Sequence, residues 1–235
     1  MSPAVGCIFI TLRRSETRFK QIFMIRIQKF VFNSFQVNTY ILYDETAECI
    51  IVDAANSDDK ENREINDFIE KNKLKPVRNL CTHCHIDHIL GNGFFKESYG
   101  ISPEYHQASE PFFFTVREIA GSFGYNLNHI PEPKGYLKED DKIHFGTSEL
   151  HILYTPGHAE GSVCFYSKDQ EFVITGDVLF RDTIGRTDLP SGNFELLMKS
   201  IKNKLFALPD ATIVYPGHGP ETNIGYEKRN NPFIR

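Results

Sequence analysis

The chain contains 235 residues with a net charge of −5 and a sequence pI of about 6.0. This acidic balance excludes a strongly basic surface, so we expect no binding to nucleic acid or to anionic membranes. With 40% hydrophobic and 24% charged residues, the composition is typical of one globular domain with a substantial core. The sequence lacks an apolar run of about 18 residues, so we predict no transmembrane helix.

The N-terminal residues 1–23 are expected to form an extension outside the fold, because Met24 opens the strand-like run MIRIQKFVF. The apolar stretch Ala4–Leu12 is followed by Arg13 and Arg14, whereas a secretory signal has its basic residues first. A weak targeting segment is the alternative. We assign residues 24–235 to one domain. Five scattered cysteines without regular spacing predict no disulfide framework and favour a cytoplasmic location: Cys7, Cys49, Cys81, Cys84 and Cys164.

The first half of the domain is predicted to contain four strands and two helices. Two β-rich runs separated by the polar pair Asn33-Ser34 indicate a hairpin. Apolar residues at helical spacing indicate an amphipathic helix in the charged segment that follows the third strand. The predicted strands are Ile25–Phe32, Val37–Tyr43, Glu48–Asp53 and Pro76–Thr82, and the predicted helices are Asp58–Lys73 and Ile89–Tyr99.

The second half repeats the pattern of strands and helices. A helix is predicted at Glu110–Ile119, and the segment Gly121–Gly135 is rich in turn-forming residues and indicates a loop. Five further strands are predicted at Lys142–Phe145, Glu149–Tyr154, Ser162–Tyr166, Glu171–Thr175 and Ala211–Tyr215, with a helix at Phe194–Phe206. Two sheets with helices outside them, in a single α/β domain, would satisfy this order.

The most informative motif is Thr82-His83-Cys84-His85-Ile86-Asp87-His88, between a predicted strand and a predicted helix. In extended backbone, residues two apart project to the same side, so His83 and His85 are able to share one metal ion. A turn into the helix would direct Asp87 and His88 toward a neighbouring position. Imidazole and carboxylate ligands favour zinc, and they also suit iron and manganese.

Three more candidate ligands follow predicted strands, each directly after a glycine: His158, Asp177 and His218. Glycine permits a sharp turn and a close approach of the backbone at such a position. Loops after strand ends are where a rigid scaffold presents chemical groups. Five histidines and two aspartates in these contexts predict a metal centre. The other histidines are expected to be structural: His106, His129, His144 and His151.

These motifs resemble the metallo-β-lactamase superfamily, whose signature is H-x-H-x-D-H followed by a distant His, Asp and His. The resemblance implies a four-layer αββα sandwich with two divalent metal ions, zinc being favoured over iron or manganese. It implies that His83, His85 and His158 bind the first ion and that Asp87, His88 and His218 bind the second, with Asp177 bridging them.

Within the superfamily, residues 25–234 look like type II glyoxalases (hydroxyacylglutathione hydrolases) and their shorter relatives. The matching segments are Ile51–Asp53, Leu80–Asn92, Thr155–His158, Gly161, Thr175–Phe180, Gly185–Asp188, Tyr215–Pro220, Gly225–Glu227 and Asn231–Phe233. Full type II glyoxalases carry a C-terminal helical domain that supplies much of the glutathione site. Because the sequence ends 17 residues after His218, we expect that domain to be absent, so the chemistry transfers better than the substrate.

The resemblance implies a small-molecule thioester or related ester substrate, attacked by a hydroxide bound between two metal ions. Asp177 would position both ions, and Asp87 would orient the hydroxide as well as ligate. Asp53 at a strand end is either a partner for a ligand imidazole or a solvated residue. Arg186 either contacts an anionic substrate or pins its loop to Asp188.

Two further groups of residues are candidates for a functional role. Phe112, Phe113 and Phe114 are candidates for a substrate mouth, although adjacent phenylalanines on a helix are more often partly core. Cys81 and Cys84 form a C-x-x-C pattern, which we discount as a redox or zinc site because His83 and His85 lie in the same run. As strand residues three apart, the two cysteines would face opposite sides, with Cys84 pointing away from the histidines.

The principal alternative function is a mononuclear iron persulfide dioxygenase of the same superfamily, which would use one iron on two His and one Asp. The Gly185–Asp188 stretch fits both families, whereas a complete second ligand set favours the hydrolase. A nuclease is disfavoured by the acidic charge, and a flavo-diiron protein by His85, where that family has Glu. Seven intact ligands also argue against a non-catalytic binding module. The oligomeric state is left open.

Overall fold

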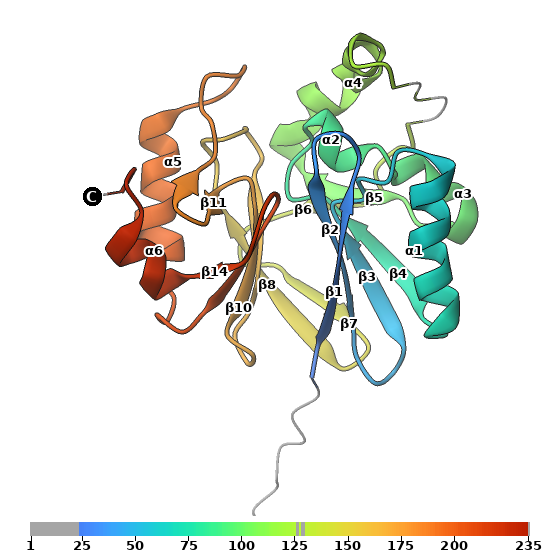
Figure 1. Ribbon diagram of the computed structural model, residues 1–235, viewed down its shortest axis with the longest axis horizontal. Coiled ribbons are helices and arrows are strands. Elements are labelled where there is room, and N and C mark those ends of the chain that lie inside the picture. The colour runs from blue at the N-terminus through green and yellow to red at the C-terminus, as the bar shows by residue number, and fades with distance from the viewer. Residues whose placement is uncertain (1–23, 126, 128–129, 235) are drawn as a thin grey trace, which may run out of the picture.

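The computed structural model describes residues 24–125, 127 and 130–234, so the expectation for residues 1–23 lies outside the described residues. Two six-stranded sheets stack face to face, and helices cover the outer side of each sheet (Figure 1). The predicted αββα sandwich is therefore confirmed. All strands of the first sheet precede those of the second in the chain, so the molecule consists of two halves built one after the other.

The first sheet has the strand order β1-β2-β3-β4-β5-β6. Its strands are β1 (Arg26–Phe32), β2 (Val37–Tyr43), β3 (Glu48–Val52), β4 (Lys75–Leu80), β5 (Pro103–His106) and β6 (Gly135–Leu137). The β1–β2 and β2–β3 pairs are antiparallel, and the pairs from β3 to β6 are parallel. Parallel pairing requires the chain to cross back between strands, which places helices on the outer face.

The second sheet has the order β14-β13-β10-β9-β8-β7. Its strands are β7 (Lys142–Phe145), β8 (Ser148–Tyr154), β9 (Val163–Ser167), β10 (Phe172–Gly176), β13 (Ile213–Pro216) and β14 (Thr222–Asn223). The β10–β13 pair is parallel, and the other pairs are antiparallel. A separate short ribbon joins β11 (Leu179–Phe180) to β12 (Thr183–Ile184).

Helices cover both outer faces and the edge where the motifs lie (Figure 1). On the first sheet these are α1 (Asp59–Lys71) and α3 (Asn92–Tyr99), and on the second α5 (Phe194–Ser200), the π-helical turn Ile201–Leu205 and α6 (Ile224–Asn230). The short α2 (Ile86–Ile89) and α4 (Glu110–Ser122), which follows a 3-10 turn at Gln107–Ser109, lie at the edge. Within the described residues, none of the helices has the length and apolar character to span a bilayer.

The alternation of side chains along the strands explains the layers. On β2, Tyr40 and Leu42 face the core between the sheets, while Ile41 faces the outer cluster. On α1, Ile65 and Ile69 are one turn apart and fill that outer cluster. Strands β3 and β10 therefore appear as nearly continuous apolar runs in the sequence, because both of their faces are buried.

The structure differs from the sequence-based expectation in several elements. The predicted helix Ile89–Tyr99 is two helices, and α2 begins inside the histidine motif at Ile86. A Cβ at Gly91, between the two helices, would lie 2.0 Å from Asn56 Oδ1, so a larger residue at that bend would have to displace the buried Asn56 side chain. The strands β5, β6, β11, β12 and β14 have two to four residues and were not predicted, because such short segments show little periodic pattern.

Candidate metal centre

The seven predicted ligands meet at one edge of the sandwich, where strands of both sheets end. His83 and His85 lie between β4 and α2, Asp87 and His88 on α2, His158 after β8, Asp177 after β10, and His218 after β13. Four of the residues thus come from the first half of the chain and three from the second. Loops at the carboxyl ends of β4, β10 and β13 bring together residues far apart in sequence.

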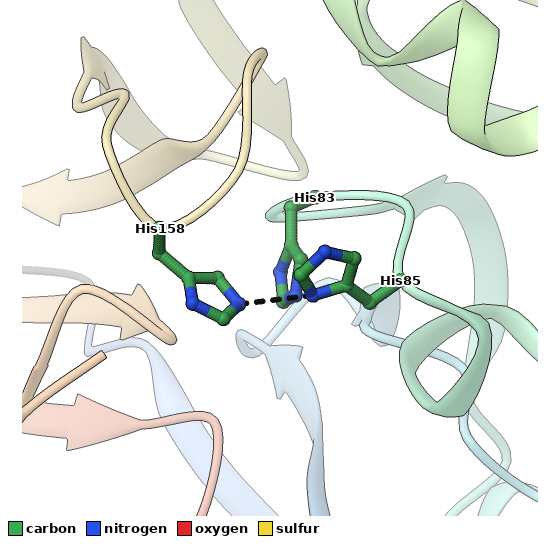
Figure 2. A group of neighbouring side chains, drawn as sticks. All are labelled: His83, His85 and His158. Atoms are coloured by element: carbon green, nitrogen blue, oxygen red, sulfur yellow. Dashed lines mark hydrogen bonds between the residues drawn. The ribbon is translucent and has the colours of Figure 1, made fainter. Parts of the chain in front are cut away.

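His83, His85 and His158 form the first group of potential ligands. One nitrogen of each ring lies within 4.8 Å of the others. Figure 2 shows the three rings converging, with His158 on the opposite side of the centre from His83 and His85. The dashed contact joins His158 Nε2 and His85 Nδ1 at 3.0 Å. Three imidazoles converging in this way match the His₃ ligand set that zinc accepts.

Asp87, His88 and His218 form the second group, with ligand atoms also within 4.8 Å of one another. Asp177 lies between the two groups. Its Oδ1 is 3.4 Å from His88 Nε2, and its Oδ2 is 3.5 Å from His218 Nε2 and 3.6 Å from His158 Nε2. The carboxylate thus reaches both groups, as expected for a bridging ligand.

Asp53 orients two residues of the histidine motif, Thr82 and His88. Its carboxylate accepts hydrogen bonds from Thr82 N at 2.7 Å and Thr82 Oγ1 at 2.7 Å, and it lies 3.0 Å from His88 Nδ1. With a carboxylate at Nδ1, the proton of neutral His88 resides there, and Nε2 is free to coordinate. Thr82 Oγ1 also contacts His83 Nδ1 at 3.1 Å. Of the two interpretations of Asp53, the structure supports the partner of a ligand imidazole.

Backbone carbonyls orient two other imidazoles. His158 Nδ1 donates to Arg186 O at 2.8 Å, and His218 Nδ1 donates to Phe35 O at 3.0 Å. In both rings the proton is therefore held on Nδ1, and Nε2 faces the centre. Such partners raise the basicity of the ligand and fix its ring plane.

The buried polar atoms of the centre fit a cation. His83 Nε2, His88 Nε2 and Asp177 Oδ1 are buried and have no hydrogen-bond partner among the described residues. Unpaired buried polar atoms are costly, so their convergence on one point indicates a missing positive partner. Nitrogen and carboxylate oxygen donors are those that zinc, iron and manganese accept.

The electrostatics divide the centre into two parts. Burial and, to a smaller extent, the charge of neighbouring His158 together lower the pKa of His85 to about 4. Burial also opposes protonation of His218, but its hydrogen bonds to Asp177 and Asp87 raise its pKa to about 9. The first group is thus neutral and ready to coordinate, whereas the second group must release a proton when it binds a metal ion.

The glycines before the ligands are required by close packing. Gly157 has a φ of +134°, and a Cβ there would lie 2.2 Å from the backbone N of Leu197. A Cβ at Gly217 would lie 2.2 Å from Asp177 Oδ1. Each turn therefore needs glycine to let its ligand approach the centre, as the sequence pattern predicted.

The other predicted residues are distributed differently. Arg186 makes a two-pronged pair with Asp188, with Nε to Oδ1 and Nη2 to Oδ2 both at 2.7 Å, on the exposed surface. This pairing matches the interpretation in which Arg186 pins its loop, and a contact with substrate stays a prediction. The ring of Phe112 lies 5.7 Å from that of His85, whereas Phe113 is buried in the core.

The expectation that Cys81 and Cys84 face opposite sides was wrong. Both thiols are buried in one apolar cluster with Tyr105, because β4 ends at Leu80 and the backbone beyond it is not a strand. All cysteines in the described part of the chain are free.

Among the histidines expected to be structural, His106 stacks on Tyr154 with ring centroids 4.3 Å apart. His144 and His151 lie beside Glu149 on the second sheet, away from the centre. His129 lies outside the described residues.

Sequence reasoning missed the contribution of the β1–β2 turn. Phe35 supplies a carbonyl to His218, and Asn33 Nδ2 donates to Asp87 O at 2.9 Å. These contacts use backbone atoms or span long sequence separations, so no local pattern reveals them. The one available signal was the Asn33-Ser34 break itself, which indicated only a turn.

Comparison with known proteins supports these findings. Residues 33–218 match the family model described as "Metallo-beta-lactamase superfamily". The chain is 38% identical to a "Probable metallo-hydrolase YqgX" of Bacillus subtilis, over 85% of this chain and 92% of that protein. It is 32% identical to a "Hydroxyacylglutathione hydrolase GloC" of Haemophilus influenzae, over 86% of this chain and 94% of the relative.

Solved structures give the same result. The BLEG-1 B3 metallo-beta-lactamase superposes with a TM-score of 0.80 at 31% identity, covering 89% of this chain and 99% of that one. TTHA1623 in a di-iron-bound form has a TM-score of 0.78 at 31% identity, covering 88% and 99%. ETHE1 from Myxococcus xanthus has a TM-score of 0.71 at 27% identity, covering 88% and 83%. With its αββα fold, its His and Asp cluster and the family match over residues 33–218, this chain belongs to the metallo-β-lactamase superfamily.

Proposed function

We propose that the protein is a hydrolase that uses two divalent metal ions, zinc being favoured, to cleave a thioester of the hydroxyacylglutathione type or a related ester. The observation that carries this proposal is the complete second ligand group, Asp87, His88 and His218, joined to the first group by Asp177. The 32% identity to a hydroxyacylglutathione hydrolase supports the choice of substrate class.

The residues of the centre have distinct roles in this proposal. Two ions bound there would lower the pKa of a shared water toward about 7 and polarise the substrate carbonyl. His83, His85 and His158 would hold the first ion, and Asp87, His88 and His218 the second. Asp177, whose oxygens reach both groups, would fix their separation.

Asp87 is the residue we assign to orienting the attacking water. Its Oδ2 lies 3.6 Å from His88 Nε2 and 3.5 Å from His218 Nε2, at the centre of the second group. Hydrogen bonding and the charge of His88 outweigh burial and keep the pKa of Asp87 below its ordinary value. Its carboxylate is thus ionised at neutral pH and able to accept a hydrogen bond from the water.

Aromatic residues beside the centre are suited to exclude bulk water. The ring of Phe112 lies 5.7 Å from that of His85, and the ring of Phe180 lies 6.2 Å from that of His218. One ring thus lies beside a ligand of each group. In the proposed reaction the acyl part of a small substrate packs against them, and exclusion of water strengthens the electrostatic interactions inside. Arg186, if released from Asp188, is the candidate to contact an anionic part of the substrate.

A mononuclear iron persulfide dioxygenase is the second candidate. The likeness to the ETHE1 structure favours it, and another structural neighbour, TTHA1623, is described in a di-iron-bound form, which supports iron as a candidate metal. The two functions differ in metal content as well as in reaction, so one set of measurements separates them.

The test is metal analysis of the purified protein combined with two activity assays. Two zinc ions per chain with hydrolysis of lactoylglutathione would support the hydrolase. One iron per chain with oxygen uptake dependent on glutathione persulfide would reject it. Asp177→Ala should abolish hydrolysis and lower the metal content, whereas Asp141→Ala, which removes an exposed carboxylate outside the centre, should change neither.

A further inference from the structure

The turn between β1 and β2 contacts two ligands of the second group, Asp87 and His218. We propose that Asn33 is a positioning residue that sets the metal affinity of the second group independently of the first. The turn comprises Asn33–Gln36 and lies beside α2, which carries Asp87 and His88 (Figure 1). This inference rests on the two-ion centre of the proposed function.

The side chain of Asn33 holds three backbone groups. Its Nδ2 donates to Asp87 O and to Ala55 O, both at 2.9 Å. Its Oδ1 accepts from Phe35 N at 2.9 Å. Asn33 thus fixes the backbone that carries Asp87 and the peptide unit that leads to the Phe35 carbonyl.

The Phe35 carbonyl in turn determines the orientation of His218. It accepts the hydrogen bond from His218 Nδ1 at 3.0 Å, which holds the proton on Nδ1 and leaves Nε2 for a metal ion. Val37, directly after the turn, forms an isolated antiparallel bridge with His218. One side chain, that of Asn33, therefore connects Asp87 to His218 through its two hydrogen-bonded arms.

The first group depends on other parts of the fold. His83 Nδ1 contacts Thr82 Oγ1, and His158 Nδ1 donates to Arg186 O. Thr82 is held by Asp53, and Arg186 belongs to the loop after β12. A change in the β1–β2 turn should consequently alter the second group while leaving the first group intact.

The turn is itself braced from two sides. Asn33 N donates to Glu61 Oε1 at 2.6 Å, which connects the turn to α1. On the other side, Ser34 Oγ lies 2.7 Å from Tyr125 OH, and the rings of Phe35 and Phe123 meet edge to face at 5.4 Å. Because the turn is held on both sides, the Phe35 carbonyl has a fixed position, and the His218 imidazole must orient toward it.

The experiment compares two glycine substitutions in the same turn. Asn33 has φ of +55° and Gln36 has φ of +59°, so glycine is accommodated by the backbone at either position. Asn33→Gly removes the three hydrogen bonds, whereas Gln36→Gly removes an exposed side chain with no described contact to a ligand. Cobalt(II) is titrated into each metal-free protein, and visible absorption with chelator competition gives the two dissociation constants.

For Asn33→Gly we expect the second dissociation constant to rise about 10- to 100-fold, the range typical for loss of a partner that orients a ligand. The first constant should stay within about twofold of the wild type. Gln36→Gly should leave both constants unchanged. Asn33→Asp serves as a second variant, because it keeps an acceptor for Phe35 N but cannot donate to Asp87. Its added negative charge would by itself attract a cation, so weaker binding at the second site would identify the lost hydrogen bond as the cause.

An unchanged second constant in both Asn33 variants, or an equal loss at both sites, would overturn the inference. These results differ from failure of the proposed function. A wild-type protein that binds one ion would reject the two-ion hydrolase and, with it, a second site for Asn33 to tune. A wild-type protein that binds two ions without cleaving thioesters would reject only the substrate class, and the comparison of dissociation constants would still decide the role of Asn33.

Discussion

Replacement of Asp53 by asparagine tests how strictly the ligand imidazoles must be oriented. Asparagine has nearly the same shape and tolerates the backbone φ of +54° at this position. If its amide oxygen accepts from Thr82 N, its NH₂ group faces His88 Nδ1. His88 would then have to accept at Nδ1 and carry its proton on Nε2, where it blocks coordination. In the opposite amide orientation the NH₂ group would face Thr82 N, and two donors would then meet without an acceptor.

The structure gives the size of the effect. Loss of such a partner weakens metal binding by about 10- to 100-fold, or about 1.4–2.8 kcal/mol. Three hydrogen bonds reach the Asp53 carboxylate, and bonds to charged groups contribute about 1.5–3 kcal/mol each. Because asparagine retains one acceptor oxygen, we expect the metal-free protein to lose about 2–4 kcal/mol of unfolding free energy.

The assay measures zinc affinity by chelator competition and stability by urea denaturation of the metal-free protein. Asp44→Asn is the matched control, because Asp44 is also a buried carboxylate that accepts hydrogen bonds, from Thr46, Thr147 and Ser148, but lies away from the centre. It should lose stability and keep its zinc affinity. Zinc affinity within twofold of the wild type in Asp53→Asn would refute the assignment of Asp53 as the partner that orients His88.

Three further predictions concern packing and pH. Gly157→Ala should lower the unfolding free energy, measured in urea, by about 2 kcal/mol or more, because the new Cβ would meet the α5 backbone. A Cβ at Gly100 would meet no atom within 4 Å, so Gly100→Ala should lower it by only about 1 kcal/mol. Equal losses in the two variants would contradict this prediction. Burial opposes ionisation of Asp44, but its hydrogen bonds keep its pKa below the ordinary value. The stability that Asp44 contributes should therefore be present above about pH 4 and decline as the pH falls through its lowered pKa, so the difference between wild type and Asp44→Asn in urea should shrink. A constant difference down to pH 2 would count against it. Because the pKa of His218 is raised to about 9 in the metal-free protein, zinc binding at pH 7.5 should release at least one proton, measurable by calorimetry in buffers of different ionisation enthalpy; zero release would show a neutral ring.

The metal ligands were predictable because their signals are local. The spacing of His83, His85, Asp87 and His88, and the glycines before His158 and His218, are consequences of backbone geometry over a few residues. The sandwich followed from strands buried on both faces, which appear as apolar runs of recognisable length.

The orientation of the ligands could not be predicted, because it depends on contacts between distant residues. Asp53 and His88 are 35 positions apart, and Phe35 and His218 are 183 apart. In the second pair the acceptor is the backbone carbonyl of Phe35, and because every residue has such a carbonyl, the residue type at position 35 does not indicate the contact. The start of α2 at Ile86 was missed for a related reason, since a four-residue helix is too short to show a periodic pattern.

The origin of the ligands in both halves of the chain has a consequence for how the protein unfolds. His83, His85, Asp87 and His88 follow the first sheet, and His158, Asp177 and His218 follow strands of the second. Bound ions would therefore act as reversible cross-links between two halves that otherwise meet through the apolar core between the sheets and through hydrogen bonds. Separation of the sheets at this edge would require metal release first, so metal loading should slow unfolding as well as raise the unfolding free energy. The lifetime of the folded protein would then depend on the metal supply of its surroundings.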